Sequence, residues 1–90
     1  MAVLSEEAIR ARMATVPGWE RAGNEIRRAY TFGSFKEAME FANLVAEKAD
    51  AADHHPDILV QYRKVTLTLT SHDAGGLTER DFRLAASLPA

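Results

Sequence analysis

Two neighbouring segments that alternate apolar and polar residues constrain this fold more than any other feature of the sequence. Residues 58–62 and 65–71 each carry an apolar side chain at every second position, and only Arg63 and Lys64 separate them. A period of two is typical of a strand with one buried face. We therefore expect an antiparallel hairpin with threonine along its other face. Its predicted pairs are Tyr62 with Val65, Val60 with Leu67, and Ile58 with Leu69.

The remaining periodic segments predict three helices and a second hairpin. Ser5 opens a helix that stops at 16–18, and residues 19–22 and 25–33 form strands around a Gly23-Asn24 turn. A capping box at 34–37 opens a long helix ending by His55, and 78–81 opens the last helix. The order α-β-β-α-β-β-α predicts an α+β fold: a two-layer sandwich whose four-stranded antiparallel sheet has helices on one face. We expect residues 1–90 to form a single domain.

Composition excludes several classes of function. The chain has no cysteine, so it has no disulfide framework and no thiolate metal site. A formal net charge of −2 argues against binding nucleic acid through bulk electrostatics. No apolar run approaches the roughly 20 residues of a membrane span. We expect no signal peptide, because the first residues lack an apolar stretch after a basic start. We expect a cytoplasmic protein, and its small size favours a homo-oligomer.

All three histidines lie in two short segments, Asp53-His54-His55-Pro56-Asp57 and Ser71-His72-Asp73. Histidine is the side chain whose ordinary pKa lies nearest neutral pH. Extending the predicted hairpin register places His55 opposite His72, at one edge of the sheet. Each histidine alone suits a helix end or a loop, but their predicted convergence favours a site for proton transfer or for a metal.

The spacing of these histidines fits a metal poorly. Adjacent histidines do not reach one ion as residues four apart on a helix do, and no H-E-x-x-H pattern occurs. The sequence also lacks a phosphate-binding glycine loop, a nucleophile elbow and a thiol. Acid–base chemistry by histidine is therefore favoured, with no metal expected. A metal-dependent hydrolase that uses the same histidines remains the less favoured alternative.

These segments resemble the pterin-4a-carbinolamine dehydratase family. The resemblance rests on DHHPD at 53–57, YRKV at 62–65, TSHDAGGLTERD at 70–81 and Leu84-Ala85. Gly18-Trp19 and the aromatic pattern over 30–41 also match. It implies dehydration of a 4a-hydroxytetrahydropterin to quinonoid dihydropterin, without metal or cofactor, in the recycling of tetrahydrobiopterin for an aromatic amino-acid hydroxylase. The family fold has the same order of helices and strands.

The resemblance also implies site residues and partners. The family's essential histidines match His54, His55 and His72, and the pterin would contact Asp50, Pro56, Ser71, Asp73, Ala74, Trp19 and Arg80. Ala74 stands where animal members carry cysteine, so no catalytic role attaches to it. Members form homodimers or homotetramers through sheet edges and helices. Animal members also act as dimerisation cofactors of a homeodomain transcription factor, so a protein-binding or dimerisation module is a second hypothesis.

Overall fold

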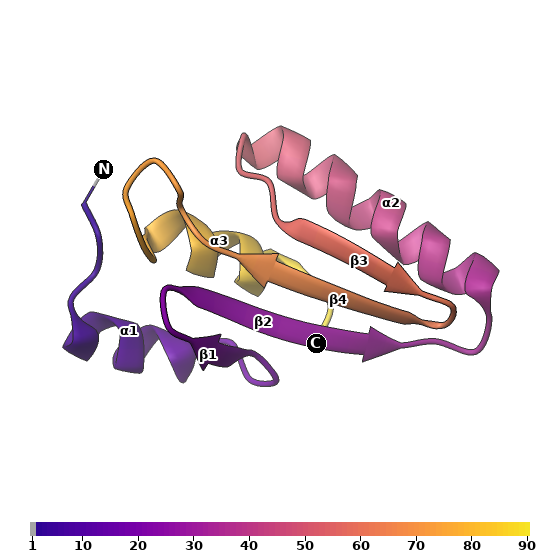
Figure 1. The fold of residues 1–90 in the computed structure, drawn as a ribbon, viewed down its shortest axis with the longest axis horizontal. Helices are drawn as coiled ribbons and strands as arrows, with labels where there is room; N and C mark the ends of the chain where they lie inside the picture. Colours follow the sequence, from indigo (N-terminus) through magenta and orange to yellow (C-terminus); the bar gives the residue numbers. More distant parts are fainter. Residues whose placement is uncertain (1) are drawn as a thin grey trace.

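Helices alternate with pairs of strands along the chain, in the predicted order (Figure 1). The structure, a computed structural model, describes residues 2–90. It confirms an α+β fold with a four-stranded antiparallel sheet. The elements are α1 (Glu6–Met13), β1 (Glu20–Ala22), β2 (Glu25–Thr31), α2 (Phe35–Ala52), β3 (Asp57–Gln61), β4 (Lys64–Leu69) and α3 (Glu79–Ser87).

The sheet has the strand order β1-β2-β4-β3 and buries one of its faces. Alternate residues of the two central strands point into the core, and side chains from all three helices join the same cluster. The opposite face is open, with Arg27, Ala29 and Thr31 exposed. The prediction of helices on one face is therefore confirmed. The buried residues of the central strands are Ile26, Tyr30, Val65, Leu67 and Leu69.

The register of the β3–β4 hairpin differs from the prediction. Val60 pairs with Val65 rather than Leu67, so each β3 residue meets a residue two positions earlier than expected. The turn consists of Tyr62 and Arg63, because Tyr62 takes a left-handed backbone with φ 55°. A shift of two preserves which face each side chain occupies. However, the observed register, extended past the strand, sets His55 across from Thr70, so the predicted opposition of His55 and His72 is wrong.

The C-terminal end of α2 positions the double-histidine segment. Asp53 adopts a left-handed conformation with φ 50° and ψ 41°, and its N–H donates to the carbonyls of Ala49 and Asp50. The N–H of His54 also donates to the carbonyl of Ala49, at 3.1 Å. This pattern is the Schellman type of helix end, in which a left-handed residue turns the chain off the helix axis. His54 therefore leaves α2 in a fixed direction, and Pro56 prevents the helix from continuing.

The other helix ends follow the predicted caps with one difference. Ser5 caps α1, and Thr78 with Asp81 forms the capping box of α3. At α2, Ser34 accepts from the N–H of Glu37, whereas the Glu37 carboxylate accepts from Gly33 instead of Ser34. Half of that predicted box is thus present. Within residues 2–90, no helix combines the length and apolar character needed to cross a membrane.

Candidate active site

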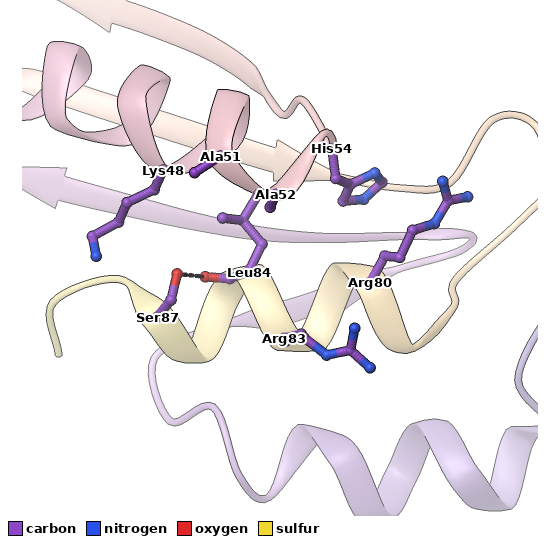
Figure 2. Close-up of a pocket in the computed structure, with 8 residues that line it drawn as sticks. All are labelled: Lys48, Ala51, Ala52, His54, Arg80, Arg83, Leu84 and Ser87. Carbon is purple, nitrogen blue, oxygen red and sulfur yellow. Dashed lines mark hydrogen bonds between the residues drawn. The ribbon is translucent and has the colours of Figure 1, made fainter.

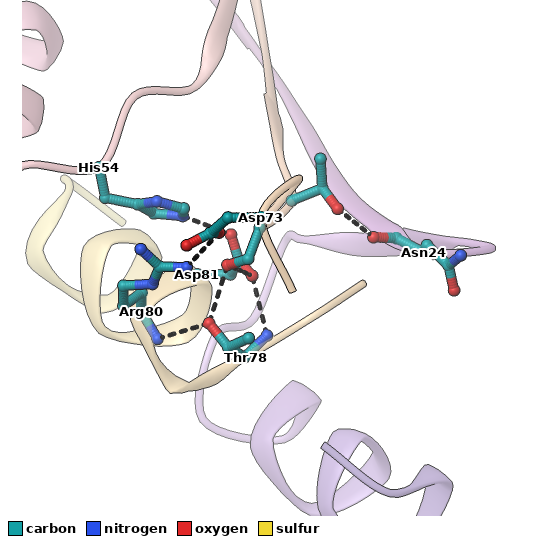
Figure 3. Close-up of polar contacts among 8 residues, drawn as sticks. Asn24, His54, Asp73, Thr78, Arg80 and Asp81 are labelled. Carbon is teal, nitrogen blue, oxygen red and sulfur yellow. Dashed lines mark hydrogen bonds and ion pairs between the residues drawn. The ribbon is translucent and has the colours of Figure 1, made fainter. Parts of the chain in front are cut away.

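A buried carboxylate, Asp81, joins the two histidine-bearing segments to the start of α3 (Figure 3). Its Oδ1 lies 2.6 Å from Nε2 of His54, at the end of α2. Its Oδ2 accepts hydrogen bonds from the hydroxyl of Ser71 and from the backbone N–H of Thr78, both at 2.9 Å. Asp81 has 0% exposed surface, so these bonds are protected from water. One side chain therefore links α2, the segment after β4, and α3.

These contacts indicate which nitrogen of His54 carries a proton. The hydrogen bonds from Ser71 and Thr78 both end on Oδ2 of Asp81, so Oδ1 is the oxygen that faces Nε2 of His54, and an N–H at that nitrogen would donate to it. A neutral imidazole with hydrogen on Nε2 keeps Nδ1 free to accept a proton. The side chain of His54 is only 8% exposed, so its orientation is held by the surrounding structure. This arrangement equips His54 as an oriented general base.

His55 and His72, unlike His54, are exposed to solvent. Nε2 of His55 is 2.9 Å from Oδ1 of Asp50, with the two side chains 60% and 78% exposed. His72 is exposed and directly follows Ser71, in a loop that closes through a bridge between Ser71 and Gly76. Exposed imidazoles remain accessible to a ligand and can rotate toward it.

Asp81 brings the two predicted segments together by binding the neighbour of each outer histidine. His55 follows His54, and His72 follows Ser71, so each lies one residue, about 3.8 Å between Cα atoms, from a residue bound to Asp81. The convergence therefore comes from a helix carboxylate and not from strand pairing. Sequence reasoning treated Asp81 only as a helix cap. The one available signal was the unusual Asp in place of Glu in the capping box.

An ion pair fixes the loop that follows His72. Nη2 of Arg80 lies 2.5 Å from Oδ1 of Asp73. This hydrogen bond with Arg80 holds the pKa of Asp73 below its ordinary value. Ala74 is half-buried in the same loop, and its N–H donates to the carbonyl of Ser71. Arg80 has one buried nitrogen, Nε, without a hydrogen-bond partner within residues 2–90.

A cavity of about 370 Å³ opens beside His54, between the C-terminal half of α2 and α3 (Figure 2). This volume lies within the range of roughly 300–1,000 Å³ that is usual for small-molecule sites. Its floor is mainly alanine and leucine, with basic side chains around it. The lining residues are Lys48, Ala51, Ala52, His54, Arg80, Arg83, Leu84 and Ser87.

Of two further predicted site residues, Trp19 lies away from the histidines and Pro56 lies next to them. Trp19 is buried in the core, 6% exposed, and lines a separate cavity of about 130 Å³ with Arg28 and Ala85. None of the histidines lines that cavity. Pro56 is half-buried between the histidine pair and β3. Among the described residues, no three His, Asp or Glu side chains converge in a way that suits a metal ion.

Comparison with known sequences identifies relatives over the whole described chain. A family model described as pterin 4 alpha carbinolamine dehydratase matches residues 2–90. An Acidobacterium capsulatum protein, provisionally named a pterin-4-alpha-carbinolamine dehydratase, is 53% identical over 90 residues, or 100% of this chain and 98% of that protein. A Thermomicrobium roseum protein with the same provisional name is 51% identical over 98% of this chain and 95% of its own length.

Two solved structures share this fold. The crystal structure of a transcriptional coactivator/pterin dehydratase from Brucella melitensis matches with a TM-score of 0.88 and 30% identity, over 92% of this chain and 90% of that chain. A pterin dehydratase-like protein, described as a RuBisCO assembly factor in the alpha-carboxysome, matches with a TM-score of 0.57 and 20% identity, over 79% and 89%. The second likeness extends to the fold alone.

Proposed function

The chain belongs to the pterin-4a-carbinolamine dehydratase family, and we propose that it is a hydro-lyase acting on a 4a-hydroxytetrahydropterin. The proposed reaction breaks the C4a–oxygen bond, releases the hydroxyl as water and yields quinonoid dihydropterin. The observation that carries this proposal is the contact of His54 with Asp81, together with two exposed histidines, His55 and His72, that each follow a residue bound to Asp81.

The chemistry requires one acid and one base, and imidazole serves as either near neutral pH. The departing hydroxyl takes a proton to leave as water, and a base removes a proton from a ring nitrogen. We assign His54 and His55 to the reacting edge of the pterin and His72 to the side of the hydroxyl. Asp81 touches His54 and not the substrate, so it is a positioning residue. The reaction consumes no cofactor and needs no metal.

Substrate contacts are proposed for residues around these histidines. Asp50 already lies within hydrogen-bond distance of His55 and is exposed to a ligand. Pro56, Asp73, Ala74 and Arg80 lie close to the histidines in sequence or through the Asp73–Arg80 ion pair. Ser71 is 1% exposed and its hydroxyl is bound to Asp81, so its proposed substrate contact rests on the family resemblance. Trp19 retains its proposed role only through the family resemblance, because the structure places it in the core.

The proposed setting is recycling of tetrahydrobiopterin in the cytoplasm, beside an aromatic amino-acid hydroxylase. Residues 1–90 would form one catalytic domain that assembles as a homodimer or homotetramer. The exposed edge strand β3 supports assembly, since Ile58, Leu59 and the adjacent Tyr62 are apolar or aromatic and between 36% and 68% exposed. Analytical ultracentrifugation at several protein concentrations tests this part, and a monomer throughout would contradict it.

A second candidate function, a protein-binding module, is favoured by the description of the 30% identical structural neighbour as a transcriptional coactivator. A variant with all three histidines changed to alanine distinguishes the two functions, because it should lose dehydratase activity but keep protein binding. Retained binding of a defined protein partner by that variant, without dehydratase activity in the wild type, would favour the module.

The enzyme proposal is tested with a chemically prepared carbinolamine. Loss of water, followed by ultraviolet absorbance, should be faster with the protein than with buffer alone. Substitution of His54, His55 or His72 by alanine should each lower the rate by about 100-fold or more, the usual size of an acid–base contribution. A wild-type rate equal to that of buffer would overturn the proposal.

A further inference from the structure

The cavity between α2 and α3 is basic in a protein that is acidic as a whole. The full sequence has 13 acidic and 11 basic residues, excluding histidine. Yet Lys48, Arg80 and Arg83 line this cavity, and among the described residues no carboxylate does (Figure 2). A cavity lined by one sign of charge over an apolar floor concentrates the field that it presents to a ligand.

Two of these cations have no ion-pair partner within residues 2–90. The positions three and four residues from Lys48 along α2 are Leu44, Val45, Ala51 and Ala52, so its own helix offers no carboxylate. Arg83 has Glu79 four residues before it, but Oε1 of Glu79 accepts from Nε of Arg12 at 2.7 Å. Lys48 and Arg83 are therefore available to an outside anion.

Arg80, the third basic residue of the cavity, already has an anionic partner. One of its outer nitrogens is bonded to Asp73, while the buried Nε has no partner within the described chain. A buried donor without an acceptor carries a free-energy cost, but this nitrogen has almost no accessible surface, so the proposed site depends on Lys48 and Arg83. The unsatisfied donor belongs to a residue that lines the cavity, next to His54.

His54 lines the same cavity as Lys48 and Arg83, so a substituent on a ring held at His54 would have access to both cations. Lys48 lies four residues before the last residue of α2, or about 6 Å along the helix axis, and Arg83 lies about one turn beyond Arg80 on α3. We propose that this groove binds an anionic group, a phosphate or carboxylate, at the end of the pterin side chain. This inference rests on the proposed dehydratase activity but changes its substrate: the side chain of tetrahydrobiopterin carries no charge, so an anionic side chain would put a different tetrahydropterin in the setting proposed above.

The test compares two pterins whose 6-substituents differ only by a terminal phosphate. Their unreactive 7,8-dihydro forms are titrated into the protein, and binding is followed by calorimetry. The phosphorylated form should bind about tenfold more tightly, as two partly exposed charges would produce. Raising the salt concentration should reduce that ratio. A variant with Lys48→Gln and Arg83→Gln should bring the ratio close to one.

A matched control removes two charges elsewhere. Arg63→Gln with Lys64→Gln makes the same change in net charge at the far end of the hairpin (Figure 1). This control should keep the wild-type ratio. A ratio near one in the wild type, or a ratio that K48Q/R83Q leaves unchanged, overturns the inference.

The failure of this inference differs visibly from that of the proposed function. If both pterins bind equally and the carbinolamine still loses water faster, only the anionic subsite is refuted. If neither pterin binds and no rate enhancement occurs, both proposals are overturned.

Discussion

The imidazole of His54 and the carboxylate of Asp81 meet at 2.6 Å although 27 positions separate them in sequence. The contact is buried, and the same carboxylate also accepts a hydrogen bond from the hydroxyl of Ser71. It therefore fixes the ring of His54 and, at the same time, the point from which the His72 loop departs. Both proposed catalytic segments depend on one helix residue that would not touch the substrate.

Asp81→Asn tests this positioning role. The amide keeps the size of the side chain but removes the ionised acceptor that favours hydrogen on Nε2 of His54. We expect kcat for dehydration to fall by about 10- to 100-fold, part of the usual acid–base contribution, with little change in KM. The free energy of unfolding should fall by about 1–3 kcal/mol, because buried donors lose a charged acceptor.

Nitrogen NMR of His54 separates positioning from a merely structural effect. Asp81→Asn should change the Nε2-protonated signature of the ring, whereas Asp73→Asn, the removal of an exposed carboxylate nearby, should leave it unaltered. An unchanged tautomer and kcat in folded Asp81→Asn protein would refute the role assigned to Asp81.

Asp53 tests the backbone that directs His54. At φ 50°, a residue with a Cβ is strained unless its side chain tolerates the left-handed region, as Asp and Asn do better than Ala. Asp53→Gly should match or exceed wild-type stability, whereas Asp53→Ala should lose about 1 kcal/mol. Urea denaturation measures both. Equal stability of the glycine and alanine variants would show that this conformation is not retained.

The ion pair of Asp73 and Arg80 predicts a pH effect in the loop after His72. The hydrogen bond from Arg80 lowers the folded-state pKa of Asp73. The ion pair therefore stabilises the fold at pH values above about 3.9, the ordinary pKa of an aspartate. That effect is lost as the pH falls through the lowered folded-state value. NMR titration should give Asp73 a midpoint below the ordinary value, and Arg80→Gln should restore it. A normal midpoint in the wild type would contradict the pairing.

Tyr30 predicts an alkaline effect of the opposite sign. Burial raises its pKa, partly opposed by the nearby charge of Arg28. The contribution of Tyr30 to the free energy of unfolding is fully present below about pH 10, the ordinary pKa of tyrosine. It is lost as the pH rises through the raised folded-state pKa. Tyr30→Phe should abolish that loss. At neutral pH it should cost about 1 kcal/mol, because the hydroxyl no longer donates to the carbonyl of Pro89 at 2.8 Å. Denaturation at neutral and alkaline pH compares the two proteins.

The element order follows from local patterns, which is why the sequence predicts it. Alternation in the second hairpin and the caps at Ser5, Ser34 and Thr78 each depend on residues a few positions apart. The exact register was not predictable in the same way. The left-handed Tyr62 moves the turn by one position, and neither Tyr62 nor Arg63 has typical turn chemistry.

The sequence predicts the two histidine segments of the candidate site, but not the contacts that hold them together. The histidine positions and the meeting of their segments were recognisable, whereas His54 was the residue whose direction strand alternation did not specify. Its orientation arises from the helix end at Asp53 and from Asp81, a tertiary contact between distant residues. The basic cavity likewise requires α2 and α3 to be packed together before Lys48 and Arg83 share a surface.

The central claim is that the segments of His54, His55 and His72 form one pterin site. A crystal structure of the protein with 7,8-dihydrobiopterin tests it most directly. We expect all three imidazoles to contact a single pterin ring, with Asp81 still bound to His54. A pterin bound elsewhere, or contacted by only one of the two segments, would contradict the account.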